Sequence, residues 1–152
     1  MGAEVTVFSH SSNKKEDALK MGAKHFIMTS DEKWAEQAGG DFDLILSTRD
    51  VSEGFPLSQF LSLLDVNCRF ITVGMPDKPL PSIMSQDMAG NGALCGGSHI
   101  GSKKEALAML EFAAKHNIRA WTNVMPMKDA SKAVRSTHDN SVRYRNVLKC
   151  DL

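Results

Sequence analysis

The sequence predicts an α/β fold built on a doubly wound parallel sheet. Two observations support this prediction. Strand-like and helix-like segments alternate over roughly the first 117 residues, which is the order that β-α-β crossovers produce. The predicted strands also end in small, polar or glycine-rich residues, at the edge where ligands lie in such sheets. A chain of 152 residues is long enough for one domain with a single core.

Five segments have the composition of strands. β-Branched and aromatic residues concentrate in them, and turn-forming residues bound them. In chain order they are Met1–Ser9, Lys24–Met28, Phe42–Ser47, Arg69–Val73 and Ala93–Cys95. The third is apolar on both faces, which predicts a helical cover on both sides of it.

Four segments up to residue 116 are predicted to be helical. They are Lys14–Met21, Asp31–Ala38, Pro56–Leu64 and Ser102–His116. The last begins with the S-x-x-E form of a capping box and carries an apolar stripe that includes Leu107 and Leu110. Beyond it the alternation changes: Trp121–Met127 is extended, Lys128–Thr137 is helical and Val142–Cys150 is strand-like.

The composition excludes several classes of function. Lys and Arg together number 18, as do Asp and Glu, so the formal net charge is zero and a general nucleic-acid or membrane-surface binder is disfavoured. No apolar run approaches the roughly 20 residues that a membrane-spanning helix needs, and no apolar signal stretch follows Met1. We therefore expect a cytoplasmic protein. The cysteines Cys68, Cys95 and Cys150 lie far apart, without zinc-ligand spacing, which predicts reduced thiols and no metal site made by this chain alone.

The end of the first predicted strand carries the most specific signal. NAD-selecting folds place Asp or Glu at the strand end that meets the adenosine ribose. Here the strand ends in Ser9, and His10, Ser11 and Lys14 follow, so hydroxyls and a cation stand where an acid would repel a 2′-phosphate. This pattern favours NADP, although an ordinary serine-rich helix cap with solvated lysines fits the same residues.

Three separated motifs resemble a known family. Gly2–Ser9 with Ser11–Ala23 is similar to the second strand and following helix of NADP-dependent, zinc-type medium-chain alcohol dehydrogenases, most closely the cinnamyl alcohol dehydrogenase-like branch. Gly97–Glu105 and Asp139–Arg145 resemble further strings of that branch, in the same order. The resemblance runs from Gly2 to about Leu148, and it implies a Rossmann-like fold and hydride exchange between NADP(H) and an alcohol or aldehyde.

The resemblance also implies roles for individual residues. Ser9, His10, Ser11 and Lys14 match residues that hold the 2′-phosphate, although His10 departs from the family's usual Ser, Thr or Arg. Thr48 and Gly74 match cofactor contacts at two later strand ends. The loop of Ser98, His99 and Ile100 matches backbone contacts to the nicotinamide, and Arg145 matches an arginine that reaches the diphosphate. No residue here matches a catalytic group or a zinc ligand.

Family features that precede the second strand find no match. The sequence contains no G-x-G-x-x-G loop, and the family's catalytic domain, which supplies the zinc ligands, has no counterpart. We therefore expect a Rossmann-like sheet without its first, central strand and phosphate loop. Strands at residues 5–9 and 25–28 should then pair on one side of a gap, and those at 44–47, 70–73 and 93–95 on the other.

These expectations give a domain division and several functional hypotheses. Residues 1–120 are expected to form the incomplete cofactor domain, and residues 121–152 to pack on a catalytic domain. One hypothesis is an oxidoreductase fragment with weak NADPH binding and no turnover of its own. A second is a non-catalytic module that binds a nucleotide or docks on a full-length relative. The resemblance implies a dimer edge at the strand near Ala93–Gly96, through which a heterodimer with such a relative or a homodimer would form. A third is a truncated product without separate activity.

Overall fold

The computed structural model describes residues 2–139 and 141–151, and the chain divides into two compact units between His99 and Ile100. Each unit is described separately below. The expected functional boundary after residue 120 lies inside the second unit; it concerns packing on a catalytic domain and stays a prediction.

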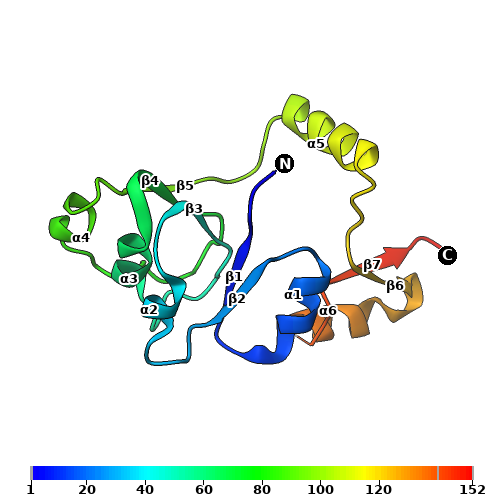
Figure 1. The fold of residues 1–152 in the computed structure, drawn as a ribbon. Helices are drawn as coiled ribbons and strands as arrows, with labels where there is room; N and C mark the ends of the chain where they lie inside the picture. The colour runs from blue at the N-terminus through cyan, green and yellow to red at the C-terminus, as the bar shows by residue number, and fades with distance from the viewer. Residues whose placement is uncertain (1, 140, 152) are drawn as a thin grey trace. The chain divides into compact units, whose positions relative to one another are not determined.

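The first unit holds two parallel sheets (Figure 1). Strands β1 (Thr6–Ser9) and β2 (His25–Met28) pair in parallel, with Thr6 opposite His25 and Ser9 opposite Met28. Strands β3 (Phe42–Ser47), β4 (Leu64–Thr72) and β5 (Leu94–Gly97) form a second parallel sheet in that order. The parallel α/β class is confirmed, and the described strands divide into the two groups that the sequence predicts on either side of a gap.

The helices of the first unit are short. They are α1 (Lys15–Lys20), α2 (Trp34–Ala38), α3 (Leu57–Ser62) and α4 (Ser85–Ala89), and a 3₁₀ turn η1 (Ser12–Lys14) precedes α1. Helix α2 begins later than expected because residues 31–33 form a turn. Helix α4 was not predicted; the Asp87 carboxylate closes its first turn by accepting a 2.8 Å hydrogen bond from the Met84 N–H.

Strand β4 is longer than the sequence predicts. It begins at Leu64, opposite Phe42, and the pairing then jumps so that Leu44 lies opposite Arg69. Asn67, with a φ of 59°, occupies the left-handed region inside the irregular stretch. In the early part of the strand, Asp65 and Asn67 alternate with apolar residues, so the segment lacks the continuous apolar run expected of a buried strand, and composition alone predicts a start at Arg69.

An aromatic cluster forms the core of the first unit. Phe70 and Leu61 are completely buried, and Trp34 packs against Phe60 with ring centroids 4.7 Å apart. Phe8 of β1 meets the rings of both Phe60 and Phe42, at 5.3 and 5.5 Å between centroids. The two-stranded sheet is therefore attached to the larger sheet through side-chain packing within this unit.

One face of the larger sheet departs from expectation. Ile45 points into the core at 6% exposure, whereas Leu44 and Leu46 are 55% and 56% exposed. Leu94, which aligns with Leu44 across β4, is also exposed. The prediction of a helical cover on both sides of Phe42–Ser47 is thus wrong for the described residues, because the core cluster occupies one face alone.

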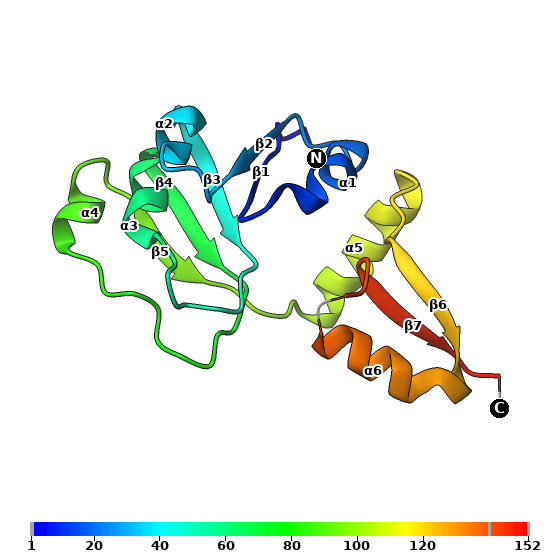
Figure 2. The same ribbon diagram turned by 90° about the horizontal axis from the view of Figure 1, so that it is seen from below.

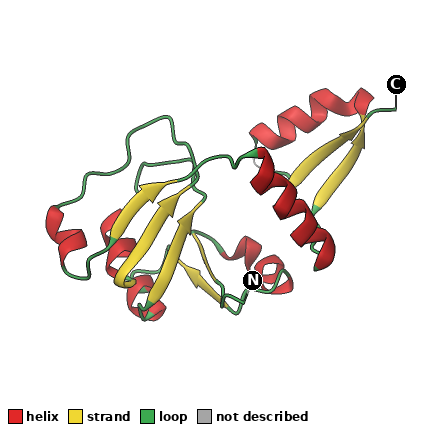
Figure 3. Cartoon of the chain, turned by 90° about the horizontal axis from the view of Figure 1, so that it is seen from above, coloured by secondary structure: helices red, strands yellow, loops and turns green. Residues whose placement is uncertain are grey.

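The second unit contains one long helix and a β-α-β element. Helix α5 (Lys103–Lys115) starts at the predicted capping box, in which the Ser102 N–H donates to the Glu105 carboxylate at 2.6 Å. Strands β6 (Thr122–Pro126) and β7 (Arg145–Lys149) pair in parallel and are joined through η2 (Met127–Asp129) and α6 (Ala130–His138), as Figure 2 shows. Figure 3 shows the helices and paired strands of the chain coloured by type of secondary structure.

The apolar stripe of α5 is not buried. Leu107 and Leu110 are 52% and 59% exposed, so the amphipathic pattern correctly predicts the helix but not a covered face. Across the described residues, we find no helix with the length and apolar character needed to cross a membrane.

Candidate nucleotide-binding site

The turn after β1 presents hydroxyls and a cation at the carboxyl end of a strand. Ser9 ends β1, and its carbonyl accepts a 2.9 Å hydrogen bond from the Thr29 N–H just beyond β2. Ser11 is extended and precedes η1, in which Lys14 is the last residue. His10, Ser11 and Lys14 are exposed, and no carboxylate occurs between Ser9 and Glu16. The donor set therefore fits a phosphate ester, since every side chain here can donate a hydrogen bond to it.

The strand ends of the larger sheet converge at a second edge. The Val73 and Gly74 N–H groups both donate to the Ser47 carbonyl, at 2.9 and 3.3 Å, which places Thr48 beside Gly74. The Ser98 N–H donates to the Thr72 carbonyl at 3.0 Å and brings the end of β5 to the same edge. Thr48, Gly74 and Ser98 are thus brought together, as the parallel topology predicts.

Gly74 sits where a side chain would not fit. A Cβ at this position would lie 2.1 Å from the Arg49 carbonyl oxygen, which is far inside van der Waals contact. The backbone after β4 therefore runs directly against the backbone after β3. A glycine is needed here because the Arg49 backbone occupies the place that a side chain would take.

A polar loop that the sequence analysis missed fixes this edge. The Asp50 carboxylate accepts a 3.0 Å hydrogen bond from the Met75 N–H and ties the two loops together. The Arg49 guanidinium lies 5.5 Å from the Phe55 ring centroid and donates to the Glu53 carbonyl at 2.9 Å. An Asp in the loop that follows a strand is the available signal, because its short carboxylate commonly accepts hydrogen bonds from backbone N–H groups.

The remaining candidates, His99, Ile100 and Arg145, are all exposed. His99 is exposed at the end of the first unit, and Ile100, at 85% exposure, begins the second. Arg145 is exposed at the first position of β7, opposite Thr122. Because Ile100 and Arg145 belong to the second unit, their cofactor contacts stay predictions.

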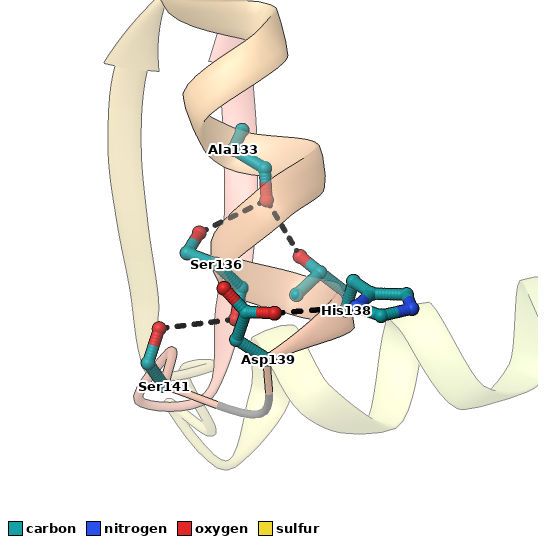
Figure 4. Close-up of polar contacts among 6 residues, drawn as sticks. Ala133, Ser136, His138, Asp139 and Ser141 are labelled. Atoms are coloured by element: carbon teal, nitrogen blue, oxygen red, sulfur yellow. Dashed lines mark hydrogen bonds and ion pairs between the residues drawn. The ribbon is translucent and has the colours of Figure 1, made fainter.

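A hydrogen-bond network at the end of α6 was also missed. The Ala133 carbonyl accepts from the Ser136 and Thr137 hydroxyls, both at 2.9 Å, and the Ser141 hydroxyl donates to the Ser136 carbonyl at 3.2 Å (Figure 4). The Asn146 amide joins this network from β7. An amide beside hydroxyl-bearing helix residues gives no distinctive sequence pattern, since the contacts depend on how β7 lies against α6.

Metal-ligating side chains are dispersed. Among residues 2–139 and 141–151, no three His, Cys, Asp or Glu side chains gather in a way that could hold an ion. Partial desolvation of the Cys68 thiol, with the Asp43 and Asp65 carboxylates nearby, raises its pKa and favours the neutral thiol over the thiolate that binds zinc. The family's zinc therefore finds no donor set in the described part of this chain.

Comparison with known proteins identifies the family. The family described as "Zinc-binding dehydrogenase" matches residues 1–115. Mannitol dehydrogenase of Petroselinum crispum is 40% identical over 97% of this chain, and cinnamyl alcohol dehydrogenase 2 of Arabidopsis thaliana is 38% identical over the same share. The chain belongs to the zinc-binding dehydrogenase family, in its medium-chain, zinc-type alcohol dehydrogenase group.

Solved structures agree with this assignment. A cinnamyl alcohol dehydrogenase from Sorghum bicolor superimposes with a TM-score of 0.88 at 31% identity, covering 97% of this chain and 41% of that one. The structure of CAD from Helicobacter pylori complexed with NADP(H) gives 0.79 at 33% identity, with the same two shares. This chain spans about two fifths of the length of its curated relatives, 43% of the parsley enzyme and 39% of the Arabidopsis one.

Proposed function

We propose that this chain binds NADP(H) as the cofactor-binding part of an oxidoreductase that interconverts alcohols and aldehydes. The observation that carries the proposal is the turn from Ser9 to Lys14, which offers hydroxyl and ammonium donors at a strand end and no carboxylate. The family assignment and the NADP(H) complex of the Helicobacter pylori relative support the choice of cofactor.

Each candidate residue has a proposed contact. Ser9, His10, Ser11 and Lys14 bind the 2′-phosphate through charge-assisted hydrogen bonds. Thr48 and Gly74 line the edge at which β3 and β4 end, where the cofactor backbone approaches closely. Ser98, His99 and Ile100 meet the nicotinamide through main-chain groups, and Arg145 binds the diphosphate. When bound, the cofactor supplies hydride chemistry, and the residues of this chain bind and orient it.

Turnover is not expected from this chain alone. No residue in it is proposed as a catalytic group, and zinc belongs to the full-length relatives. Zinc-dependent reduction of an aldehyde by the purified chain, measured as NADPH oxidation with and without added Zn²⁺, would contradict this part of the proposal.

Titration with NADPH and NADH tests cofactor selection. The Lys14→Ala variant is expected to bind NADPH about tenfold to a hundredfold more weakly, because a charge-assisted hydrogen bond contributes about 1.5–3 kcal/mol, while its affinity for NADH stays unchanged. Lys14→Arg should retain most of the preference. Lys20→Ala is the matched control, since Lys20 lies on α1 and forms an exposed ion pair with Glu16 at 3.7 Å. Equal NADPH affinity in wild type and Lys14→Ala would refute the 2′-phosphate assignment.

A homodimer through β5 is a second proposal. Strand β5 is the last in the order β3-β4-β5, and Leu94 on it is 54% exposed. Edge strands of this kind template pairing with another chain. Light scattering coupled to size-exclusion chromatography should show a dimer that Leu94→Lys converts to monomer, and a monomeric wild type would end the idea. Co-elution with a full-length relative would instead indicate heterodimer docking.

A further inference from the structure

The Asn146 side chain forms hydrogen bonds with residues of both α6 and β6 in the second unit. The two hydrogens of its Nδ2 are shared among three acceptors, the Ser136 hydroxyl at 2.8 Å, the Ala133 carbonyl at 3.0 Å and the Thr137 hydroxyl at 3.2 Å. Its Oδ1 accepts from the Asn123 amide of β6 at 3.1 Å. One side chain on β7 thus connects the last turn of α6 to the neighbouring strand.

The position of this amide on β7 is unusual for a side chain that faces a helix. Exposure alternates along the strand: Arg145, Val147 and Lys149 are exposed, whereas Asn146 and Leu148 are half-buried on the other face. An apolar residue at 146 would cover α6 with no requirement for a fixed register. An amide is favourable there only when its donors and acceptor meet partners, so it specifies a single register of β7 against α6.

The register of β7 against α6 determines the position of the Arg145 backbone. Arg145 is the first residue of β7 and directly precedes Asn146, with its side chain on the opposite, exposed face. The nearby Ser141 hydroxyl is held to the Ser136 carbonyl, so the same helix turn anchors both Asn146 and a residue shortly before Arg145. The Cα of Arg145 is therefore fixed by contacts that its own side chain does not make.

We infer that Asn146 is a positioning residue that holds Arg145 in place for the cofactor diphosphate. This inference rests on the proposed function, in which Arg145 supplies the diphosphate contact. A long, flexible arginine loses less conformational entropy on binding when its backbone is already fixed, and Asn146 supplies that preorganisation without touching the ligand.

A double-mutant cycle on NADPH affinity tests the inference. The variants are Asn146→Ala, Arg145→Met and the two combined, titrated with NADPH and with 2′-AMP, which carries the 2′-phosphate but no diphosphate. We expect Asn146→Ala to weaken NADPH about fivefold, the equivalent of one net hydrogen bond, and to have no further effect once Arg145 is Met. Affinity for 2′-AMP should be unchanged in all three variants.

A second variant keeps the test decisive if Asn146→Ala does not fold. Ser136→Ala removes the shortest of the Asn146 bonds and should weaken NADPH about twofold to threefold in the wild-type background alone. Circular dichroism and thermal midpoints establish that each variant is folded. Additive losses in the double mutant, or an equal loss for 2′-AMP, would mean that Asn146 acts on general stability, and the inference would be overturned.

The cycle separates the two proposals. If wild type binds NADPH and Arg145→Met weakens it while Asn146→Ala and Ser136→Ala do not, the inference about Asn146 fails and the proposed function stands. If wild type binds neither NADPH nor 2′-AMP, the proposed function fails and the inference falls with it.

Discussion

The two compact units rely on different interactions although both contain parallel strands and helices. In the first, apolar burial dominates: Trp34, Phe60, Phe70 and Leu61 form a continuous aromatic and aliphatic core. In the described part of the second, the buried apolar residues are Met125 and Ala133, and the network around Asn146 joins helix to strand. Both units share an alternating order of strands and helices, but a packed apolar core stabilises the first, whereas side-chain hydrogen bonds join helix to strand in the second.

Removing the centre of the first core should have the largest effect. Phe70→Ala deletes a completely buried ring and is expected to destabilise the first unit by about 3–5 kcal/mol. Trp34 and Trp121 lie in different units, so ¹⁹F spectra of 5-fluorotryptophan protein during urea unfolding report each one separately. The Trp34 transition should shift and the Trp121 transition should not. A common shift of both signals would show that the two units unfold together.

A medium effect is expected at the start of α5. Ser102→Ala removes the N-cap hydroxyl that accepts from the Glu105 N–H at 3.3 Å, which should cost the helix about 1 kcal/mol. Hydrogen exchange of the α5 amides measures the loss, and the protection of β3 and β4 amides serves as the internal reference. Ser102→Asp should restore protection, because Asp is an equally good N-cap, and failure to do so would argue against the capping explanation.

A small effect is expected on the exposed face of the larger sheet. Leu46→Ser should change the free energy of unfolding by less than about 0.5 kcal/mol, because the side chain is already 56% exposed. Ile45→Ser, one residue earlier and 6% exposed, is the matched control and should be strongly destabilising. Urea midpoints compare the two variants, and a large loss in Leu46→Ser would reveal a cover over this face.

The smallest effect concerns pH. The hydrogen bond from the Ser102 N–H lowers the pKa of Glu105 below its ordinary value, so the ionised carboxylate stabilises the folded start of α5. This contribution is present above the pKa of Glu105 in the unfolded chain and is lost as pH falls through its lower folded pKa. Cα chemical shifts of residues 103–106 should therefore lose helical character on acidification, and Glu105→Gln should remove that pH dependence.

Much of the fold was predictable because local signals agree with tertiary structure. Phe42–Ser47 matches β3 at both ends, and the Ser102 capping box starts α5 as predicted. The Rossmann-like strand order that the family resemblance implies, without its central strand, also predicted which strands pair. What could not be predicted depends on partners distant in sequence: β4 starts at Leu64 because that residue lies opposite Phe42, and the exposure of Leu44 and Leu46 depends on which face the helices cover.

The sequence predicted the residues of the candidate site better than the side chains that hold those residues in place. Strand ends identify Ser9, Thr48, Gly74 and Ser98, since parallel strands finish at one edge. The residues that hold those strand ends were missed. Asp50 bonds to a backbone N–H 25 residues away, and Asn146 gathers hydroxyls from a helix turn, so neither contact leaves a pattern along the chain.

The packing of Phe8 links ligand binding at the proposed phosphate turn to the folding of the first unit. Its ring packs against Trp34, Phe42 and Phe60, and Ser9 is the next residue, so the position of the turn depends on whether the core is formed. A ligand that binds this turn only in the folded state raises the unfolding free energy by mass action, by about 2.7 kcal/mol at a hundred times its Kd. NADPH would then act as a folding ligand for the first unit, and the melting temperature of that unit would report occupancy without any turnover.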